Sequence, residues 1–175
     1  LLPPTYVSNL DPNALPYLTT LLTGGSPTST DIVDKWKRKV KYINAYGPTE
    51  DSIITTLWNT KEDSSDVISI GSPVANHHVY IMNSDNNLQP IGVAGELCIS
   101  GVGLARGYLN LPELTSQKFQ DNPFYAGEKL YHTGDLAMWL PNGHIRYLGR
   151  IDDQVKIRGH RIEIAEVEKA ITSLK

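Results

Sequence analysis

The sequence predicts an α/β region followed by a small β-barrel, and after them a short hairpin and a helix. Three observations lead to this prediction. Two apolar, strand-like runs flank an amphipathic helix near the N-terminal end, and short strands separated by turns fill the middle of the chain. After residue 164, apolar side chains recur at helical spacing. We therefore expect three parts, at residues 1–66, 67–151 and 152–175.

The first part contains a predicted β-α-β unit. Leu18–Thr23 has the pattern of a short buried strand, residues 31–40 that of a helix, and Tyr42–Tyr46 that of a second strand. A crossover of this kind is strongly preferred to be right-handed and to join parallel strands. Both strands then end at one edge of the sheet, so Gly25 should lie beside Thr49.

The loop after the second strand carries the first candidate site. Gly47 and Pro48 stop the strand, because proline cannot donate a hydrogen bond to a neighbouring strand, and Thr49 and Glu50 follow directly. Ligands of open α/β sheets bind at this edge. A carboxylate next to a hydroxyl suits Mg²⁺ and the phosphate that accompanies it. An ordinary solvated turn is the alternative interpretation, since threonine and glutamate are common in turns.

The middle part alternates short apolar runs with turns, a pattern typical of a small barrel or sandwich. Strands are expected at residues 67–70, 79–82, 96–100, 130–132, 136–140 and 145–148. Asn142-Gly143 predicts a tight hairpin between the last two, because both residues accept positive backbone angles. A helix is expected at residues 113–119, and the branched residues 52–58 are expected to continue the core of the first part.

The last part predicts a strand at Val155–Ile157, a basic turn at Arg158-Gly159-His160, a returning strand at Arg161–Ile164 and a helix to the end. The apolar face of that helix has no partner visible in the sequence. Together with an opening that has no initiator methionine, this indicates a piece of a longer chain.

Composition excludes several classes of protein. Sixteen basic and nineteen acidic residues give a formal net charge of −3, so no overall basic field would attract nucleic acid. No apolar run approaches the roughly 20 residues of a membrane helix, and the N-terminal end is not a signal peptide. Cys98 is the only cysteine, which excludes an internal disulfide and a C-x-x-C metal site. These features predict a cytoplasmic protein.

Two further motifs have weak or negative implications. The run Gly101–Gly107 does not have the G-x-G-x-x-G spacing, so turns between strands explain it better than a phosphate loop. His77 and His78 are adjacent on a predicted strand and point to opposite faces. The remaining histidines, His132, His144 and His160, have no spacing typical of metal ligands.

Two turns are stronger candidates for ribose binding. Asp135 follows Gly134 in the run Tyr131–Asp135, and a carboxylate there could accept two hydrogen bonds from a vicinal diol, or it could cap its own turn. Arg150 is followed closely by Asp152 and Asp153, at the point where the strand-rich middle part ends. A cation beside carboxylates at such a boundary would suit a ribose contact next to a hinge. A surface salt bridge is the alternative for Arg150.

Together these stretches resemble the adenylation domains of nonribosomal peptide synthetases, in the superfamily of adenylate-forming ligases. The resemblance covers essentially the whole chain and extends to the bacterial phenylalanine-activating modules of the gramicidin and tyrocidine type. The motifs that carry it are Asn44–Glu50, Gly95–Ile99 through Leu109, Tyr131–Asp135 and Gly149–Glu163. By this resemblance the chain is the C-terminal part of the enzyme core plus the first elements of a mobile α+β small domain.

The resemblance implies that an amino acid reacts with ATP to give an aminoacyl-AMP and pyrophosphate. The aminoacyl group then passes to the phosphopantetheine thiol of a peptidyl carrier domain. It also implies Mg²⁺, the remainder of the adenylation domain and a small MbtH-like helper protein as partners. The implied nucleotide contacts are Gly25, Asn44 and Tyr46 around adenine, Thr49 at phosphate, Asp135, Tyr147 and Arg150 at ribose, and Glu50 at magnesium.

The resemblance also assigns a hinge, a tunnel and a substrate pocket. Asp152 would be the hinge of the small domain, and the turn Arg158-Gly159-His160 would help to form the pantetheine tunnel. The pocket positions fall on Leu22, Gly24, Ala45, Ile53 and Ile54. All are apolar and two are small, so a large hydrophobic amino acid is expected rather than a charged one.

Because the chain departs from the family pattern in some places, two alternative functions remain open. The phenylalanine modules have isoleucine, alanine and cysteine where this chain has Leu22, Gly24 and Ile54. The glycine-rich phosphate loop and the amine-binding aspartate are expected before Leu1, and the adenylation-promoting lysine after Lys175. Without them, a non-catalytic nucleotide-binding fragment is one rival. An acyl-coenzyme A ligase of the same superfamily is the other.

Overall fold

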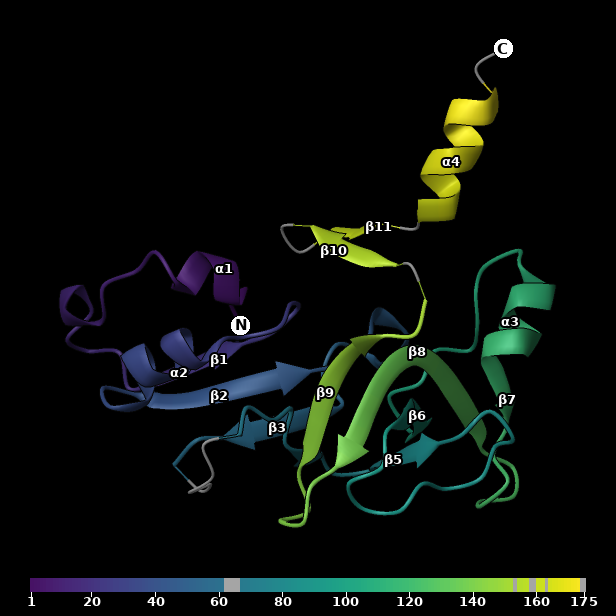
Figure 1. Ribbon diagram of the computed structural model, residues 1–175, viewed down its shortest axis with the longest axis horizontal. Coiled ribbons are helices and arrows are strands. Elements are labelled where there is room, and N and C mark those ends of the chain that lie inside the picture. Colours follow the sequence, from purple (N-terminus) through teal and green to yellow (C-terminus); the bar gives the residue numbers. More distant parts are fainter. Residues whose placement is uncertain (62–66, 153, 158–159, 163, 174–175) are drawn as a thin grey trace.

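The computed structural model describes residues 1–61, 67–152, 154–157, 160–162 and 164–173. Two sheets dominate it and lie side by side (Figure 1). The first sheet has the order β1-β2-β3-β4, formed by Thr20–Thr23, Lys41–Tyr46, Thr56–Asn59 and Ser72–Pro73. β1 and β2 are parallel, as the β-α-β pattern predicts, and the other pairs are antiparallel.

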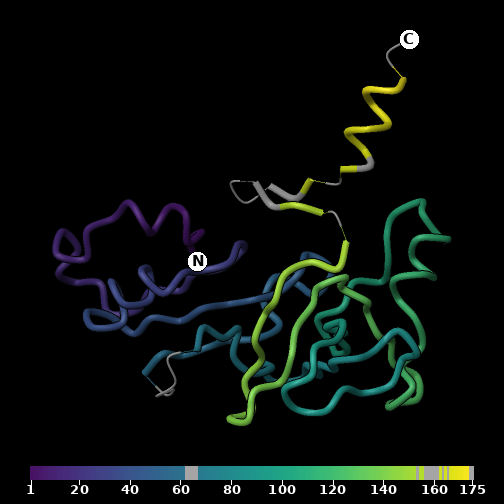
Figure 2. Tube along the Cα trace, in the orientation of Figure 1, coloured from purple at the N-terminus to yellow at the C-terminus, as the bar shows by residue number. Residues whose placement is uncertain are grey.

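Helices pack on the first sheet and enclose its core. α1 spans Pro4–Val7, a 3₁₀ turn spans Pro12–Ala14, and α2 spans Thr30–Lys37. The tube view shows the N-terminal segment close to β1, where Leu2 forms a bridge with Thr23 (Figure 2). The buried side chains of this core are Val7, Leu21, Val33, Trp36, Val40, Tyr42 and Trp58.

Two boundaries in this region were predicted wrongly by two residues or more, and one expectation about the core is correct only in part. β1 begins at Thr20 rather than Leu18, and α2 ends at Lys37 rather than residue 40. Residues 52–58 were expected to continue the core, and Thr55, Thr56 and Trp58 are buried. Ser52 and Ile53 are exposed instead, because the chain turns back there so that Thr56 pairs with Tyr46. Ser52 and Ile53 accordingly have φ angles of 52° and 81°. Such angles are uncommon for residues other than glycine.

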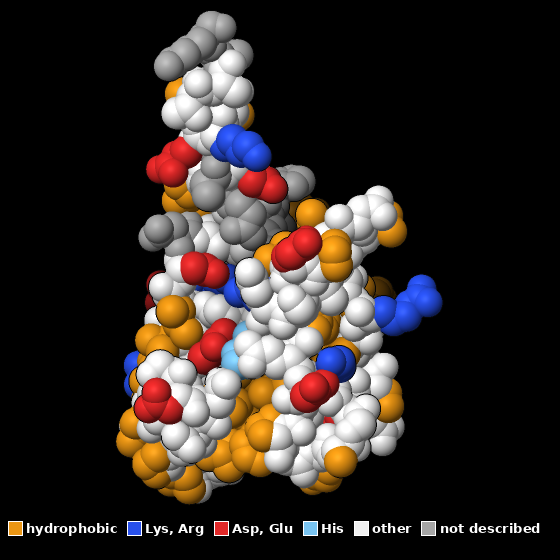
Figure 3. All heavy atoms as spheres, turned by 90° about the vertical axis from the view of Figure 1, so that its right-hand side faces the viewer, with side chains coloured by type: hydrophobic (Ala, Val, Ile, Leu, Met, Phe, Trp, Pro, Cys, Tyr) orange, Lys and Arg blue, Asp and Glu red, His pale blue; other side chains and the backbone are white. Residues whose placement is uncertain are grey.

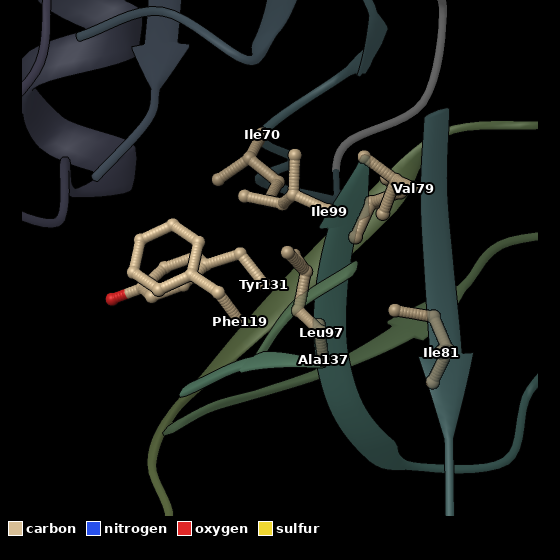
Figure 4. Close-up of a cluster of buried hydrophobic side chains, with 9 residues drawn as sticks. Ile70, Val79, Ile81, Leu97, Ile99, Phe119, Tyr131 and Ala137 are labelled. Atoms are coloured by element: carbon tan, nitrogen blue, oxygen red, sulfur yellow. The ribbon is translucent and has the colours of Figure 1, made fainter. Parts of the chain in front are cut away.

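The second sheet is antiparallel and curved (Figure 1). Its strands are β5 (His77–Met82), β6 (Gly95–Gly101), β7 (Phe119–Asp121), β8 (Lys129–Trp139) and β9 (Ile145–Arg150), in the order β5-β6-β8-β7 with β9 paired to β8. Figure 4 shows apolar side chains from several of these strands meeting in one core, including Leu97, Ile99 and Tyr131. This is the expected location of the barrel part.

Three predictions for this sheet need correction. The strands expected at residues 130–132 and 136–140 form one continuous strand, β8. Residues 67–70 form no strand, although the amide of Ile70 donates to the carbonyl of Ile145 and so joins the two sheets. In the hairpin between β8 and β9, Gly143 has a positive φ of 79°, whereas Asn142 is not among the residues with a positive angle.

The remaining elements follow the predicted order. α3 spans Pro112–Lys118, β10 (Val155–Ile157) pairs with β11 (His160–Ile162), and α4 spans Ile164–Ser173. β10, β11 and α4 lie above the two sheets in Figure 1. Figure 3 shows the side of the molecule that lies on the right in Figure 1, and hydrophobic side chains gather at its lower end. No helix in the described ranges is long and apolar enough to span a membrane.

Candidate nucleotide and amino acid site

A cavity lies at the carboxyl ends of β1 and β2, where the sequence placed a ligand site. Its floor and walls come from both sheets, so residues far apart in the chain meet there. The lining residues are Gly25, Ser26, Pro27, Asn44, Ala45, Tyr46, Gly47, Ile70, Asp135 and Tyr147. Five of the seven predicted nucleotide contacts, Gly25 among them, are therefore brought into one cavity.

Asp135 is the most heavily contacted group of this cavity. The Tyr46 hydroxyl donates to its Oδ2 at 2.5 Å, and the Tyr147 hydroxyl lies 3.4 Å from its Oδ1. Arg150 Nη1 donates to the same Oδ1 at 3.0 Å. Burial, and then the charge of Asp135, raise the pKa of Tyr147 to about 12 and that of Tyr46 well above its usual value. Both phenols therefore stay protonated and can donate hydrogen bonds to the carboxylate.

An irregularity in the β6–β8 pairing places Asp135 in the cavity. Cys98 pairs with His132 and Glu96 pairs with Leu136, so three residues of β8 lie opposite one residue of β6. Within this bulge Gly134 has a φ of 72°, and its amide donates to Glu96 Oε1 at 2.8 Å. A bulge of this kind redirects a side chain that regular pairing would place elsewhere.

A second cavity adjoins the first and extends it toward the C-terminal strands. It shares Gly25, Tyr46, Gly47 and Asp135 with the first and adds Pro48, Thr49, Ile53, Tyr131, Thr133, Arg150 and Gln154. Thr49, the predicted phosphate contact, therefore lines the same cavity as Gly25 and Tyr46, two of the predicted adenine contacts.

Glu50 lies directly behind Thr49 and is only 6% exposed. The Tyr108 hydroxyl donates to its Oε1 at 2.7 Å, and the Ala105 amide donates to its carbonyl at 2.8 Å. The glycine-rich run 101–107 thus supports the Thr49–Glu50 loop from behind, and it is a turn region, as predicted. Sequence reasoning missed Tyr108, because nothing in its local pattern indicates a contact with a residue 58 positions earlier.

The predicted pocket residues are only partly brought together. A Cβ on Gly24 would lie 2.8 Å from the carbonyl oxygen of Ala45, so these two positions are in contact. Leu22 and Gly24 alternate with the buried Leu21 and Thr23 along β1 and therefore share its other face. Ile53 lines the second cavity but is 62% exposed, and Ile54 is half-buried.

The predicted hinge residue, Asp152, is hydrogen-bonded to Arg150, one of the predicted ribose contacts. Arg150 forms two hydrogen bonds to Asp152, while its third nitrogen reaches Asp135. Burial would raise the pKa of Asp152, but the hydrogen bonds and charge of Arg150 outweigh it and lower that pKa below its usual value. Arg158 and Gly159 of the predicted tunnel lie outside the described residues, and only the backbone of His160 is described, in β11.

The fold and the cavity are those of a nucleotide-binding α/β protein, and the chain belongs to the AMP-binding enzyme family, whose profile matches residues 4–109. The resemblance to nonribosomal peptide synthetase adenylation domains is confirmed by more specific relatives. The chain is 60% identical over 171 residues to gramicidin S synthase 1 of Brevibacillus brevis and 56% identical over 172 residues to tyrocidine synthase 1 of Brevibacillus parabrevis. Each match covers 97% of this chain but only 16% of the relative.

Solved structures confirm the fold class. A holo nonribosomal peptide synthetase protein containing adenylation and PCP domains, bound to a vinylsulfonamide inhibitor, superposes with a TM-score of 0.87 at 32% identity. That match covers 98% of this chain and 31% of the solved chain. An artificially fused adenylation-PCP di-domain from Klebsiella oxytoca superposes with a TM-score of 0.81 at 28% identity, covering 95% of this chain and 32% of the fusion.

Proposed function

We propose that this chain takes part in amino acid adenylation within a longer synthetase. In the reaction, a carboxylate oxygen of the amino acid attacks the α-phosphorus of ATP. The bond from that phosphorus to the bridging oxygen of pyrophosphate breaks, and aminoacyl-AMP and pyrophosphate form. The chain spans about one sixth of the synthases it resembles, so this activity is proposed for the complete polypeptide.

The observation that carries the proposal is the position of Asp135 at the junction of the two sheets. Its carboxylate is held by Tyr46 and Arg150, faces the cavity at the carboxyl edge of the first sheet and is only 7% exposed. A fixed carboxylate can accept hydrogen bonds from both hydroxyls of a ribose. The two aromatic rings beside it, Tyr46 and Tyr147, supply flat apolar surface for a purine.

The loop after β2 has the donor types that Mg²⁺ and phosphate require. Thr49 offers a hydroxyl in the groove, and the next residue, Glu50, offers a carboxylate that Tyr108 orients. Magnesium takes one or two carboxylates together with substrate phosphate oxygens. Glu50 would hold the ion, which would neutralise charge that develops on the phosphates, while Thr49 would position a phosphate oxygen. The chain itself supplies positioning rather than a nucleophile.

The proposed substrate is a large hydrophobic amino acid. Gly24 and Ala45 contact each other at the end of the parallel pair, and neither fills the space beyond β1 and β2 with a long side chain. No charged residue is among the five proposed pocket positions. A charged substrate side chain would lose its hydration there without gaining a partner, which costs several kcal/mol.

We propose three partners for the complete protein. A peptidyl carrier domain would receive the aminoacyl group on its phosphopantetheine thiol. This partner is supported by the adenylation and PCP domains that the similar solved proteins contain. The rest of the adenylation domain would complete the core, and a small MbtH-like protein is a third partner. The buried free thiol of Cys98 and the use of ATP support the cytoplasm as the compartment.

The test is amino-acid-dependent exchange of pyrophosphate into ATP, measured on the complete polypeptide with a panel of amino acids. We expect exchange with one or a few large hydrophobic amino acids, and at least a tenfold loss in Asp135→Ala. Binding of ATP without exchange for any amino acid would instead favour the non-catalytic rival. Exchange that depends on fatty acids rather than amino acids would favour the acyl-coenzyme A ligase.

A further inference from the structure

Three side chains with metal-binding atoms meet between β6 and β8. Glu96 and Cys98 come from β6, and His132 comes from β8, directly opposite Cys98. One ligand atom from each residue lies within 4.8 Å of the other two. His132 Nδ1 is 3.0 Å from Glu96 Oε2 and 3.5 Å from Cys98 Sγ. The residues are separated in sequence by up to 36 positions, so no local spacing indicates the cluster.

The geometry is that of a ligand cluster rather than of a catalytic relay. In a thiol–imidazole–carboxylate relay, the thiol and the carboxylate contact different nitrogens of the imidazole. Here both contact the same nitrogen, Nδ1. Cys98 is also completely buried, so its sulfur is not presented to a substrate.

His132 is held in an unusual environment for a purely structural histidine. Its side chain is 12% exposed, and its Nε2 is buried without a hydrogen-bond partner among the described residues. A buried nitrogen without a partner costs free energy, so the hydrogen bonds of this imidazole do not by themselves explain its placement. A metal ion on Nδ1 would leave Nε2 as it is, but it would replace the hydrogen bonds of Nδ1 by a stronger bond that holds the buried ring in place.

We propose that Glu96, Cys98 and His132 form a site for a single Zn²⁺ ion, independently of the proposed adenylation activity. Zinc takes nitrogen at about 2.0–2.1 Å, sulfur at about 2.3 Å and carboxylate oxygen at about 2.0–2.2 Å in tetrahedral geometry. Tetrahedral angles then separate the nitrogen from the sulfur by about 3.5 Å. The Sγ–Nδ1 distance of 3.5 Å already matches, and the carboxylate needs only a small rotation.

The surroundings supply the supporting contacts that a metal site needs. The second oxygen of Glu96 accepts the Gly134 amide, which would fix a carboxylate that binds metal through its other oxygen. Cys98 packs with Met82 and Leu130 in an apolar cluster that limits access of water. On binding, Cys98 would lose its thiol proton to solvent as the sulfur–zinc bond forms, and the fourth ligand would be water.

The position gives the site a consequence for the nucleotide cavity. Its ligands flank the bulge Thr133–Asp135, with Glu96 opposite one end and the Cys98–His132 pair at the other. A bound ion would therefore link β6 to β8 around Asp135, the residue that we propose to bind ribose. Zinc should stiffen this bulge and raise the melting temperature.

The test uses the complete polypeptide, stripped of metal and then titrated with Zn²⁺ or Co²⁺. We expect one ion per chain at this site, a higher melting temperature with Zn²⁺ and a thiolate-to-cobalt charge-transfer band. Cys98→Ser should abolish the band, and His132→Gln should weaken binding at least tenfold. His78→Gln, an exposed histidine on neighbouring β5, is the matched control and should leave binding unchanged.

Two outcomes would overturn the proposal. One is the absence of the charge-transfer band in the folded parent protein. The other is a Zn²⁺-dependent rise in melting temperature that is the same in the parent and in His132→Gln. If Cys98→Ser does not fold, His132→Gln and Glu96→Gln, whose replaced side chains are partly exposed, give the same comparison.

Discussion

Arg150 donates hydrogen bonds to both carboxylate oxygens of Asp152, with Nε 2.8 Å from Oδ1 and Nη2 2.5 Å from Oδ2. The same guanidinium donates through Nη1 to Asp135 and to the carbonyl of Thr133. One side chain thus joins the proposed ribose carboxylate to the proposed hinge. A movement of the backbone at residue 152 must either carry Arg150 with it or break the paired hydrogen bonds.

Replacing Arg150 by lysine should lower kcat/KM for ATP at least tenfold. Lysine keeps the charge but cannot reach Asp135 and Asp152 at once, because it lacks the planar fork of the guanidinium. A hydrogen bond to a charged group contributes about 1.5–3 kcal/mol, and about 1.4 kcal/mol corresponds to a tenfold change. Pyrophosphate exchange measures the effect. Arg38→Lys, at an exposed helix end, should stay within twofold, and equal activity of the two variants would contradict the bridging role.

Two substitutions of Tyr46 should distinguish the contribution of its ring to ATP binding from that of its hydroxyl. Tyr46→Phe removes the 2.5 Å hydrogen bond to Asp135 but keeps the aromatic surface, so ATP affinity should fall clearly less than in Tyr46→Ala. Tyr46→Ala removes both and should weaken ATP binding at least tenfold, because stacking on a base contributes about 1–3 kcal/mol. Calorimetric titration with ATP measures both variants. A loss as large in the phenylalanine variant as in the alanine variant would exclude stacking as the main contribution.

Asp51 should make stability depend on pH. Its side chain is fully buried, and this burial raises its pKa, although Thr55 and then His77 oppose the shift. In the unfolded chain the carboxyl therefore ionises first, so its contribution to the free energy of unfolding falls as the pH rises from its ordinary pKa through the folded value. Asp51→Asn still offers an acceptor to the Thr55 hydroxyl but does not titrate. Its stability relative to the parent should therefore improve between pH 4 and pH 7.

Urea unfolding at the two pH values measures this difference. Thr55→Val provides the complementary comparison, because it removes the 2.6 Å hydrogen bond that favours the ionised carboxylate. That variant should lose more stability at pH 7 than at pH 4. A pH-independent effect of Asp51→Asn would show that its carboxylate does not titrate differently in the folded and unfolded states.

The core of the second sheet should be sensitive to cavities. Leu97 is fully buried in the cluster of Figure 4, and Leu97→Ala should cost about 2–5 kcal/mol of unfolding free energy. Leu109 is 88% exposed, so Leu109→Ala should stay within about 0.5 kcal/mol of the parent. Chemical denaturation compares the two leucines directly, and similar losses would mean that this core does not support the fold.

Gly24 should limit the size of the proposed pocket. A Cβ there would lie 2.8 Å from the carbonyl oxygen of Ala45, closer than side-chain carbons normally approach, so β1 and β2 must shift. Gly24→Ala should therefore reduce exchange with the largest amino acids at least fivefold relative to smaller ones. A panel of amino acids measures that ratio, and an unchanged ratio in a folded variant would remove Gly24 from the pocket.

The sequence predicted elements well where local pattern decides, and less well where long-range pairing does. The parallel pair β1–β2 follows from apolar runs around an amphipathic helix, and Asp135 stood out because it follows a glycine in a turn. The expectation that residues 52–58 continue the core is correct for Thr55 but wrong for Ile53, because the turn that brings the chain back to pair with β2 is a tertiary requirement. The contacts of Tyr108 with Glu50, and of Cys98 with His132, join positions with no periodic relation.

The connection between the sheets sets a limit on the exchange of modules between synthetases. β4, at Ser72–Pro73, belongs to the first sheet, and Ile70 and Gly71 exchange backbone hydrogen bonds with Ile145 of β9. A chimera joined at residue 66 would therefore combine a first sheet from one parent with its last strand from another. A junction between β4 and β5, at residues 74–76, keeps each sheet from a single parent. The contacts that cross between the sheets, such as Tyr46 with Asp135 and Tyr108 with Glu50, would still have to be matched.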